Sequence, residues 1–248
     1  EDGLGTVEGS LAASAGFAAQ TGLAGSFGTL DMAADGSWTY TLDNGSVAVQ
    51  ALDAGQIGTD TVSVSDLDGT EHQVAISILG MEDAPVVSGE FSVVIGEDDA
   101  PVTGTLSISD VDDNDTPAFA PVAMDGAHGQ LVLAGDQTWT YTPTTEALQW
   151  LDDGEQVTDI LTLVASDGTQ QDITVTVQGA NDAPVVQQPV RFAILPATSV
   201  TFSQADLLAQ AADVDAADAL SVENLDLEGA DGVLTDNGDG TWTFTPND

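Results

Sequence analysis

Short stretches of alternating apolar and polar residues fill the middle of this 248-residue chain. They predict β-strands, because alternate side chains of a strand lie on opposite faces of a sheet. The expected strands are residues 91–95, 102–109, 129–133, 138–142, 159–165 and 172–177. The third and fourth flank a turn at 134–137, which indicates a hairpin, and residues 146–151 predict a short helix or turn. The pattern is typical of an antiparallel β-sandwich, although a β-barrel or a β-solenoid would share it.

The sequence also repeats itself at a fixed spacing. Glu-Asp-Ala-Pro-Val-Val at 82–87 returns as Asn-Asp-Ala-Pro-Val-Val at 181–186, so that Asp83 and Asp182 lie 99 positions apart. A strand centred on a tryptophan recurs at 35–41, 136–142 and 239–245. This period is far too long for one coil of a solenoid and fits whole domains in tandem. We therefore predict an all-β chain of antiparallel β-sandwich domains, arranged end to end.

We place the domain boundaries at the recurring acidic-Ala-Pro segments. The first repeat spans residues 1–84, the second 85–183 and the third 184–248. The first repeat lacks a counterpart of the strand at 91–95, and the third stops before its expected last strands. The second repeat is the complete one, so the other two are expected to be partial.

The charge of the chain excludes several classes of partner. There are 42 acidic residues and a single basic one, Arg191, which gives a formal net charge of −41. Nucleic acids and anionic membrane surfaces both need Lys and Arg for binding. Intrinsic disorder is the alternative for so acidic a chain, but 42% of the residues are hydrophobic and they alternate regularly. The sequence contains no apolar run of 18 or more residues, so a membrane-spanning helix is not predicted. The lack of Cys excludes disulfides, thiol nucleophiles and Cys-based zinc sites.

Strand direction gathers the acidic residues at the two ends of each predicted sandwich. Antiparallel strands that follow one another place their loops at opposite poles, where the neighbouring repeats lie. Carboxylates about 4 Å apart repel by about 1 kcal/mol in water and about 4 kcal/mol at an effective dielectric of 20. Calcium relieves such repulsion, because it takes six to eight oxygen ligands in irregular geometry. An Asp-X-Asp segment suits it, since alternate residues of an extended chain point the same way.

These considerations predict calcium sites at the two junctions between repeats, while a solvated acidic surface accounts for most other acids. The first junction is expected to use Glu1, Glu82, Asp83, Asp110, Asp112 and Asp167. The second junction is expected to use Glu97, Asp98, Asn181, Asp182, Asp213 and Asp215. The first repeat has no Asp-X-Asp at the position of 110–112, which argues against a similar site above it, although Asp66 and Asp68 remain at that end.

Residue types that would suggest an enzyme have simpler interpretations. The only histidines, His72 and His128, lie out of register and have no marked Ser beside them, so a catalytic triad is not predicted. Paired carboxylates are too numerous to indicate glycoside hydrolysis. The recurring tryptophans at 38, 139 and 242 fit a sandwich core, whereas Trp150 replaces Ala51 and is the aromatic residue that differs between repeats. We predict that the chain is not an enzyme.

Several motifs in a fixed order carry a family resemblance. Asp-Gly-Ser-Trp-Thr-Tyr-Thr-Leu-Asp (35–43), Val-Gln-Ala-Leu-Asp-Ala-Gly (49–55) and Asn-Asp-Ala-Pro (181–184) resemble VCBS-type repeats of large secreted bacterial adhesins. Residues 198–248 resemble the related bacterial cadherin-like repeat, with Asp-Val-Asp (213–215) and Asp-Asn-Gly-Asp-Gly-Thr-Trp (236–242). The resemblance implies cadherin- or immunoglobulin-like sandwiches stiffened by Ca²⁺, at the bacterial cell surface or outside the cell, in RTX-type adhesins exported by type I secretion.

Two functions remain open at this point. One is an extender segment whose partners are the neighbouring repeats of the same chain and which projects a distal binding domain. The other is a calcium-dependent recognition module that binds a polysaccharide or a cell-surface protein directly. A ligand site should break the symmetry between repeats, and Trp150 together with the loop at 116–121 is the main sequence feature that does so.

Overall fold

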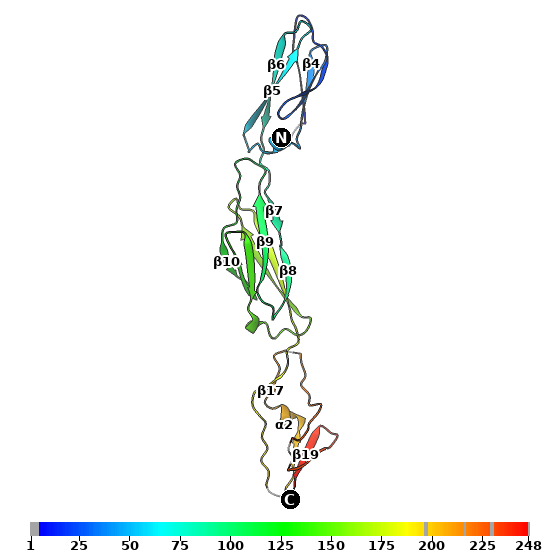
Figure 1. Ribbon diagram of the computed structural model, residues 1–248, viewed down its shortest axis with the longest axis vertical. Coiled ribbons are helices and arrows are strands. Elements are labelled where there is room, and N and C mark those ends of the chain that lie inside the picture. The colour runs from blue at the N-terminus through cyan, green and yellow to red at the C-terminus, as the bar shows by residue number, and fades with distance from the viewer. Residues whose placement is uncertain (1–4, 196–197, 216, 229–230, 248) are drawn as a thin grey trace. The chain divides into compact units, whose positions relative to one another are not determined.

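The computed structural model describes residues 5–195, 198–215, 217–228 and 231–247, and nearly all of its regular structure is β-strand (Figure 1). The chain forms two compact units. Unit 1 contains the described residues up to Gly89 together with Thr105–Ala120 and Leu163–Gln171. Unit 2 contains Glu90–Gly104, Pro121–Thr162 and the described residues from Asp172 onward. The all-β, mainly antiparallel fold class is therefore confirmed.

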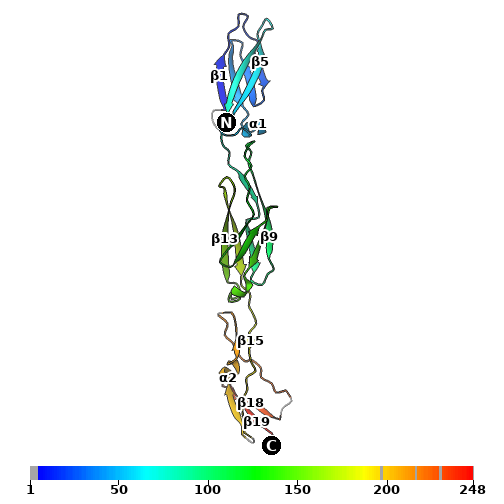
Figure 2. The same ribbon diagram turned by 90° about the vertical axis from the view of Figure 1, so that its left-hand side faces the viewer.

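The first repeat contains two antiparallel sheets around one core (Figure 2). Its elements are β1 (Thr6–Ser10), β2 (Gln20–Ala24), β3 (Gly28–Met32), β4 (Ser37–Leu42), α1 (Val47–Gln50), β5 (Ile57–Ser65) and β6 (Glu71–Leu79). One sheet has the order β1-β4-β3-β2, and β5 pairs with β6 in the other. Alternate residues of β5 and β6, including Val62, Val64, Val74 and Ile76, are buried, as the alternating pattern predicts.

The second repeat has a five-stranded sheet and a three-stranded sheet. Its elements are β7 (Val86–Gly89), β8 (Ser92–Gly96), β9 (Val102–Ser109), β10 (Val122–Asp125), β11 (Gly129–Leu133), β12 (Thr138–Pro143), η1 (Thr145–Ala147), β13 (Gln156–Val164) and β14 (Gln170–Gln178). The sheet orders are β10-β11-β12-β9-β7 and β13-β14-β8. The predicted hairpin at 129–142 is confirmed, with Leu131 opposite Tyr141.

One strand pair departs from the purely antiparallel prediction. β8 runs parallel to β14, with Val93 opposite Val175. The chain first pairs β7 with β9, then leaves that sheet after Gly89, whose φ of 142° is unfavourable for residues with a side chain. It re-enters as β8 beside the last strand. β7 and β8 belong to one continuous segment, so β8 keeps the direction that β7 has in its antiparallel pairing with β9, and this direction is parallel to β14.

The third repeat has shorter elements. They are β15 (Val185–Val186), β16 (Val200–Ser203), α2 (Gln204–Leu208), β17 (Ala211–Ala212), β18 (Gly232–Asp236) and β19 (Thr241–Pro246). The sheets are β15-β17 and β16-β19-β18. The helix α2 was not predicted; it begins with a capping box in which Ser203 and Asp206 bond each other's backbone amides. An apolar cavity of about 370 Å³ lies against the larger sheet and is lined by Phe192, Phe202 and Phe244, among others.

Trp38 and Trp139 each pack against a glycine at an equivalent position, Gly9 and Gly104. Trp139 is 1% exposed, and its Nε1 donates to the Glu90 carbonyl at 3.1 Å. A Cβ at Gly104 of β9 would lie 2.3 Å from the Trp139 ring, and a Cβ at Gly9 would lie equally close to Trp38. The predicted core role is confirmed for Trp139 and Trp242, while Trp150 is 47% exposed.

A buried carboxylate forms a second recurring feature, which the sequence pattern did not predict. Asp159 of β13 is 4% exposed and accepts hydrogen bonds from the Ala127 and His128 amides and from the Tyr141 hydroxyl, at 3.0, 3.0 and 2.8 Å. Asp60 makes the same three kinds of bond in the first repeat, where Tyr40 is the hydroxyl donor. Burial and then the nearby carboxylate raise the pKa of each tyrosine. Each repeat thus holds one loop by a buried Asp–Tyr pair.

Replacing Tyr141 by Phe is expected to lower the free energy of unfolding by about 1–3 kcal/mol, because the variant removes a donor from a buried carboxylate. Tyr40→Phe is the matched variant in the first repeat and should show a loss of similar size. Denaturant unfolding followed by tryptophan fluorescence measures both. Unchanged unfolding free energies in the two variants would contradict this structural role.

Candidate metal centres

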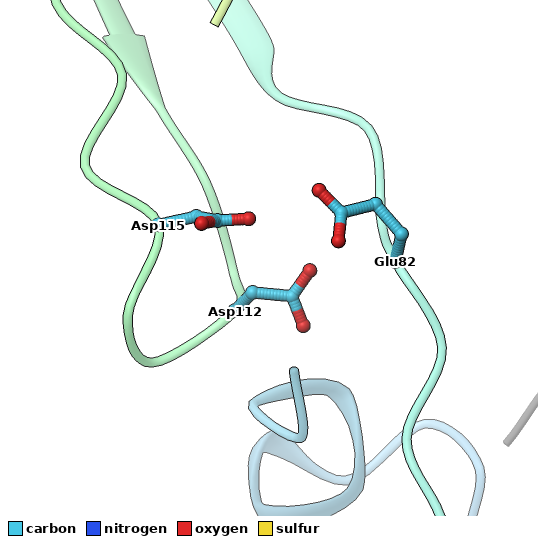
Figure 3. A group of neighbouring side chains, drawn as sticks. All are labelled: Glu82, Asp112 and Asp115. Carbon is cyan, nitrogen blue, oxygen red and sulfur yellow. The ribbon is translucent and has the colours of Figure 1, made fainter. Parts of the chain in front are cut away.

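Three carboxylates converge at the first junction. Glu82 lies in the segment after β6, and Asp112 and Asp115 lie in the loop after β9. One oxygen of each lies within 4.8 Å of the others, and Figure 3 shows the three side chains pointing toward one another. Residues far apart in sequence are therefore brought together by the end of one repeat and the first loop of the next.

Backbone hydrogen bonds hold this arrangement in place. The Asp83 amide donates to Asp112 Oδ2 at 2.9 Å, and the Asp112 amide donates to Asp110 Oδ1 at 3.0 Å. Asp53, which follows α1, accepts from the Asn114 amide at 2.9 Å. The linker, the helix end and the acidic loop are thus tied together by carboxylates.

The second junction is built in the same way. Asp213, Asp215 and Asp218 each bring one oxygen within 4.8 Å of the others. The Asp182 amide donates to Asp215 Oδ2 at 2.7 Å, and the Asp215 amide donates to Asp213 Oδ1 at 3.2 Å. Asp152 accepts from the Ala217 amide at 3.0 Å, as Asp53 does from Asn114. The equivalence of these bonds shows that the two centres share one backbone design.

Glu97 and Asp98 belong electrostatically to the second centre. Glu97 is fully buried, and its Oε1 accepts from the Ala180 amide at 2.8 Å. Burial raises the pKa of Glu97, and the charges of Asp182, Asp98 and Asp215 raise it further. Asp98 itself accepts from the Gln149 side chain at 2.8 Å. The predicted members Glu97, Asp98, Asp182, Asp213 and Asp215 therefore lie within electrostatic reach of one another.

Both centres carry uncompensated negative charge. Asp115 raises the pKa of Glu82, through a hydrogen bond and through its charge, and Asp112 and Asp110 add to the effect. Burial, then Asp98, Asp215 and Asp213, raises the pKa of Asp182. Burial, then Asp213, Asp215 and Asp152, raises the pKa of Asp218. These shifts favour the protonated carboxyls, as is expected where like charges lie close together.

Several buried carboxylate oxygens have no hydrogen-bond donor among the residues that the structure describes. They are Asp112 Oδ1, Asp215 Oδ1, Asp182 Oδ2, Asp213 Oδ2 and Glu97 Oε2. Asp112, Asp215 and Glu97 are 3%, 4% and 0% exposed. A buried ionised oxygen without a partner is costly. Hard oxygen ligands gathered in this way fit a divalent cation, and calcium in particular, because it accepts many oxygens in irregular geometry.

The remaining predicted residues have different placements. Asp167 lines a cavity of about 260 Å³ with Glu82, Asp110 and Asp115, but its carboxylate also accepts from the Thr169 amide and hydroxyl. Asn181 donates its side-chain amide to the Asp182 carbonyl and is not among the converging oxygens. Asp83 contributes a backbone amide, and Glu1 lies outside the described residues.

Sequence reasoning missed four acidic residues of these centres. Asp115 and Asp218 complete an Asp-X-Asp-X-X-Asp spacing that occurs at 110–115 and again at 213–218. Asp53 and Asp152 lie in the recurring Gln-Ala-Leu-Asp and Gln-Trp-Leu-Asp segments. Both segments recur between repeats, but the Asp-X-Asp pattern alone does not include these four residues.

Two family models match adjacent parts of the chain. Residues 82–179 match the bacterial cadherin-like domain family, and residues 180–248 match the cadherin-like domain family. A search of curated proteins finds no match. Within the described residues, no helix is long and apolar enough to cross a membrane.

Solved structures resemble this chain only weakly. The protocadherin GammaB4 extracellular domain is 14% identical, with a TM-score of 0.43, and the alignment covers 99% of this chain and 41% of that one. The PcdhgB3 EC1-4 structure is 12% identical, with a TM-score of 0.41, and the alignment covers 100% of this chain and 64% of that one. An endo-fucoidan hydrolase from glycoside hydrolase family 107 is 16% identical, with a TM-score of 0.28 and coverage of 94% and 34%. These likenesses do not bear on function. The two family matches support cadherin-like repeats over residues 82–248.

Proposed function

We propose that this chain is a calcium-stiffened extender segment of a secreted bacterial adhesin, composed of repeats at 1–84, 85–183 and 184–248. In this role the partners of each repeat are its neighbours in the same chain, and the segment projects a distal binding domain from the cell surface. Cadherin-like domains are adhesion-type modules, typically without enzymatic activity, and bacterial ones are extracellular.

The observation that carries the proposal is the set of buried carboxylate oxygens without a donor. Asp112 and Asp215 are almost fully buried, and each has one oxygen bonded to a linker amide while the other has no donor in the described structure. A purely structural aspartate would satisfy both oxygens, as Asp159 does with two amides and a hydroxyl. The unsatisfied oxygens therefore favour a bound cation.

We infer that calcium would be held at the first centre by the converging Glu82, Asp112 and Asp115, and at the second by the converging Asp213, Asp215 and Asp218. Asp110 at the first centre, and Glu97 and Asp182 at the second, would join them, because each lies within electrostatic reach of those carboxylates. A bound calcium ion supplies two positive charges to each group of carboxylates. The protein's own residues do the positioning: the amides of Asp83 and Asp182 fix the linker to the acidic loop, and Asp53 and Asp152 fix that loop to the preceding helix end.

Small-angle scattering tests the extender role. With calcium, each junction should lose conformational freedom, so the distribution of molecular sizes should be narrow and centred on elongated shapes. After chelation, repulsion among the acids and loose linkers should broaden the distribution. Sodium chloride at 1 M, where the Debye length is about 3 Å, should screen the repulsion without narrowing the distribution.

The same experiment separates the two functions. A compact particle with and without calcium would contradict an extender and would favour a recognition module. In that case the exposed ring of Trp150, which breaks the symmetry between repeats, would be the first surface to test against polysaccharides.

A further inference from the structure

The first repeat has a pair of residues at its upper end that the second repeat lacks. We define this end as the loops at 11–17 and 65–70. In the second repeat the equivalent loops are identified by matching backbone bonds: Phe17 bridges Asp66 as Phe119 bridges Ala165, and Leu67 donates to Gly16 as Ser166 donates to Ala118. Asp66 therefore occupies the position of Ala165. His72 and Gln171 correspond as well, since each is the second residue of its strand, β6 or β14.

Asp66 organises its loop by hydrogen bonds. Its Oδ1 accepts from the Thr70 amide at 2.9 Å and the Asp68 amide at 3.2 Å, while Oδ2 lies 3.1 Å from His72 Nε2. Hydrogen bonds involving Asp68, and then His72, lower the pKa of Asp66 to about 2. Since the ionised carboxylate can only accept, His72 Nε2 carries the hydrogen. Asp66 is 8% exposed, so the loss of that donor would leave a buried charge short of a partner.

Packing locks the same pair to the opposite loop. The buried ring of Phe17 meets the His72 ring edge-on, with centroids 5.4 Å apart and planes at 64°. The Leu67 amide donates to the Gly16 carbonyl at 3.0 Å, and the Gln20 side chain donates to the Ser65 carbonyl at 3.1 Å. Protein groups therefore tie the two loops to each other.

The second repeat closes the equivalent end differently. Its loop after β9 is longer and carries Asp110, Asp112 and Asp115, which belong to the first metal centre. The described residues at the upper end of the first repeat include no such convergence of three carboxylates. The Asp–His pair occurs where the converging carboxylates are missing, and Ala with Gln occurs where they are present.

We propose that Asp66 and His72 form a metal-independent clasp that orders the upper end of the first repeat in place of a bound cation. The contrast with the second repeat rests on the proposed function, whereas the clasp itself rests on its own contacts. Calcium would then control both ends of the second repeat and leave the upper end of the first repeat unaffected.

A double-mutant cycle on the full chain tests the clasp. His72→Phe keeps an aromatic ring against Phe17 but removes the donor, and it should raise the exchange rate of the Leu67 amide by about tenfold or more. Asp66→Ala introduces the residue that the second repeat has at the equivalent position, Ala165. In the double variant the His72→Phe change should have little further effect, because no buried carboxylate remains to be satisfied. His128→Phe is the control and should leave Leu67 unchanged.

Additive effects of the two substitutions on Leu67 exchange would overturn the clasp. A second measurement compares calcium with chelator in the unaltered chain. Exchange of the Leu67 amide should stay the same, and a calcium response there as large as that of the Asp112 amide would also overturn the proposal. If calcium changes exchange nowhere, the proposed function fails, while the double-mutant cycle still decides the clasp.

Discussion

Chelation of calcium is expected to lower the melting temperature of this chain by several degrees or more. Extracellular calcium modules bind with dissociation constants of about 10⁻⁴–10⁻³ M. At free calcium about ten times that constant, each site adds about 1.4 kcal/mol to the stability of the folded state. Two centres would then add about 3 kcal/mol, and for a domain of 150–250 residues 1 kcal/mol corresponds to about 2–4 °C.

The chelation experiment needs a control for general charge screening. With a net charge of −41, any salt will relieve some repulsion. Differential scanning calorimetry should therefore compare calcium with sodium chloride at matched ionic strength, and with magnesium, which demands a tighter octahedral geometry. Calcium should raise the melting temperature most. An unchanged melting curve after chelation at low ionic strength would show that calcium has no structural role.

Single charge removals are expected to disable one centre at a time. Asp112→Asn should weaken calcium binding at the first centre by roughly tenfold or more and spare the second, because Asp112 supplies the buried oxygen without a donor. Asp215→Asn should do the reverse. Asparagine keeps an oxygen that can accept from the amide of Asp83 or Asp182, so the backbone contact is retained. Asp110→Ala should also act on the first centre alone, since Asp110 accepts from the Asp112 amide.

The matched control for these variants is an exposed acid outside both centres. Asp136 lies in the turn between β11 and β12 and accepts from the Thr138 amide. Asp136→Asn removes the same charge from the chain but should leave calcium binding unchanged. A loss equal to that of Asp112→Asn would mean that total charge, and not the converging carboxylates, governs binding.

Much of this architecture could be predicted from alternation and recurrence. The pattern at 159–165 and 172–177 identified the pair β13 and β14, because one face of each strand is buried and the other is not. The structure brings the acidic loops after β9 and β17 to the segments at Asp83 and Asp182, because strand order alone decides at which end of a sandwich a loop lies. That these residues bind calcium stays a prediction. The first prediction uses alternation along a strand and the second uses the order of strands along the chain, and both can be read from the sequence without knowing any contact.

Features that depend on contacts between distant segments could not be read in this way. Asp159 lies on the buried face of β13 together with apolar residues. Its sequence neighbours do not indicate that two backbone amides and a tyrosine hydroxyl donate to it. The parallel pairing of β8 with β14 depends on a change of sheet near Gly89. Asp53 and Asp152 accept hydrogen bonds from the acidic loops and lie in segments that follow α1 and η1, and strand periodicity does not indicate such contacts.

Calorimetric titration of calcium into the chelated chain, at low ionic strength, tests the central claim most directly. The unaltered chain should bind calcium at two separable centres. Asp112→Asn should weaken binding at the first centre by roughly tenfold or more, and Asp215→Asn should weaken binding at the second by a similar factor. The double variant should show almost no heat in the millimolar range. Absence of binding by the unaltered chain, or equal residual binding in all three variants, would contradict calcium centres built on these carboxylates.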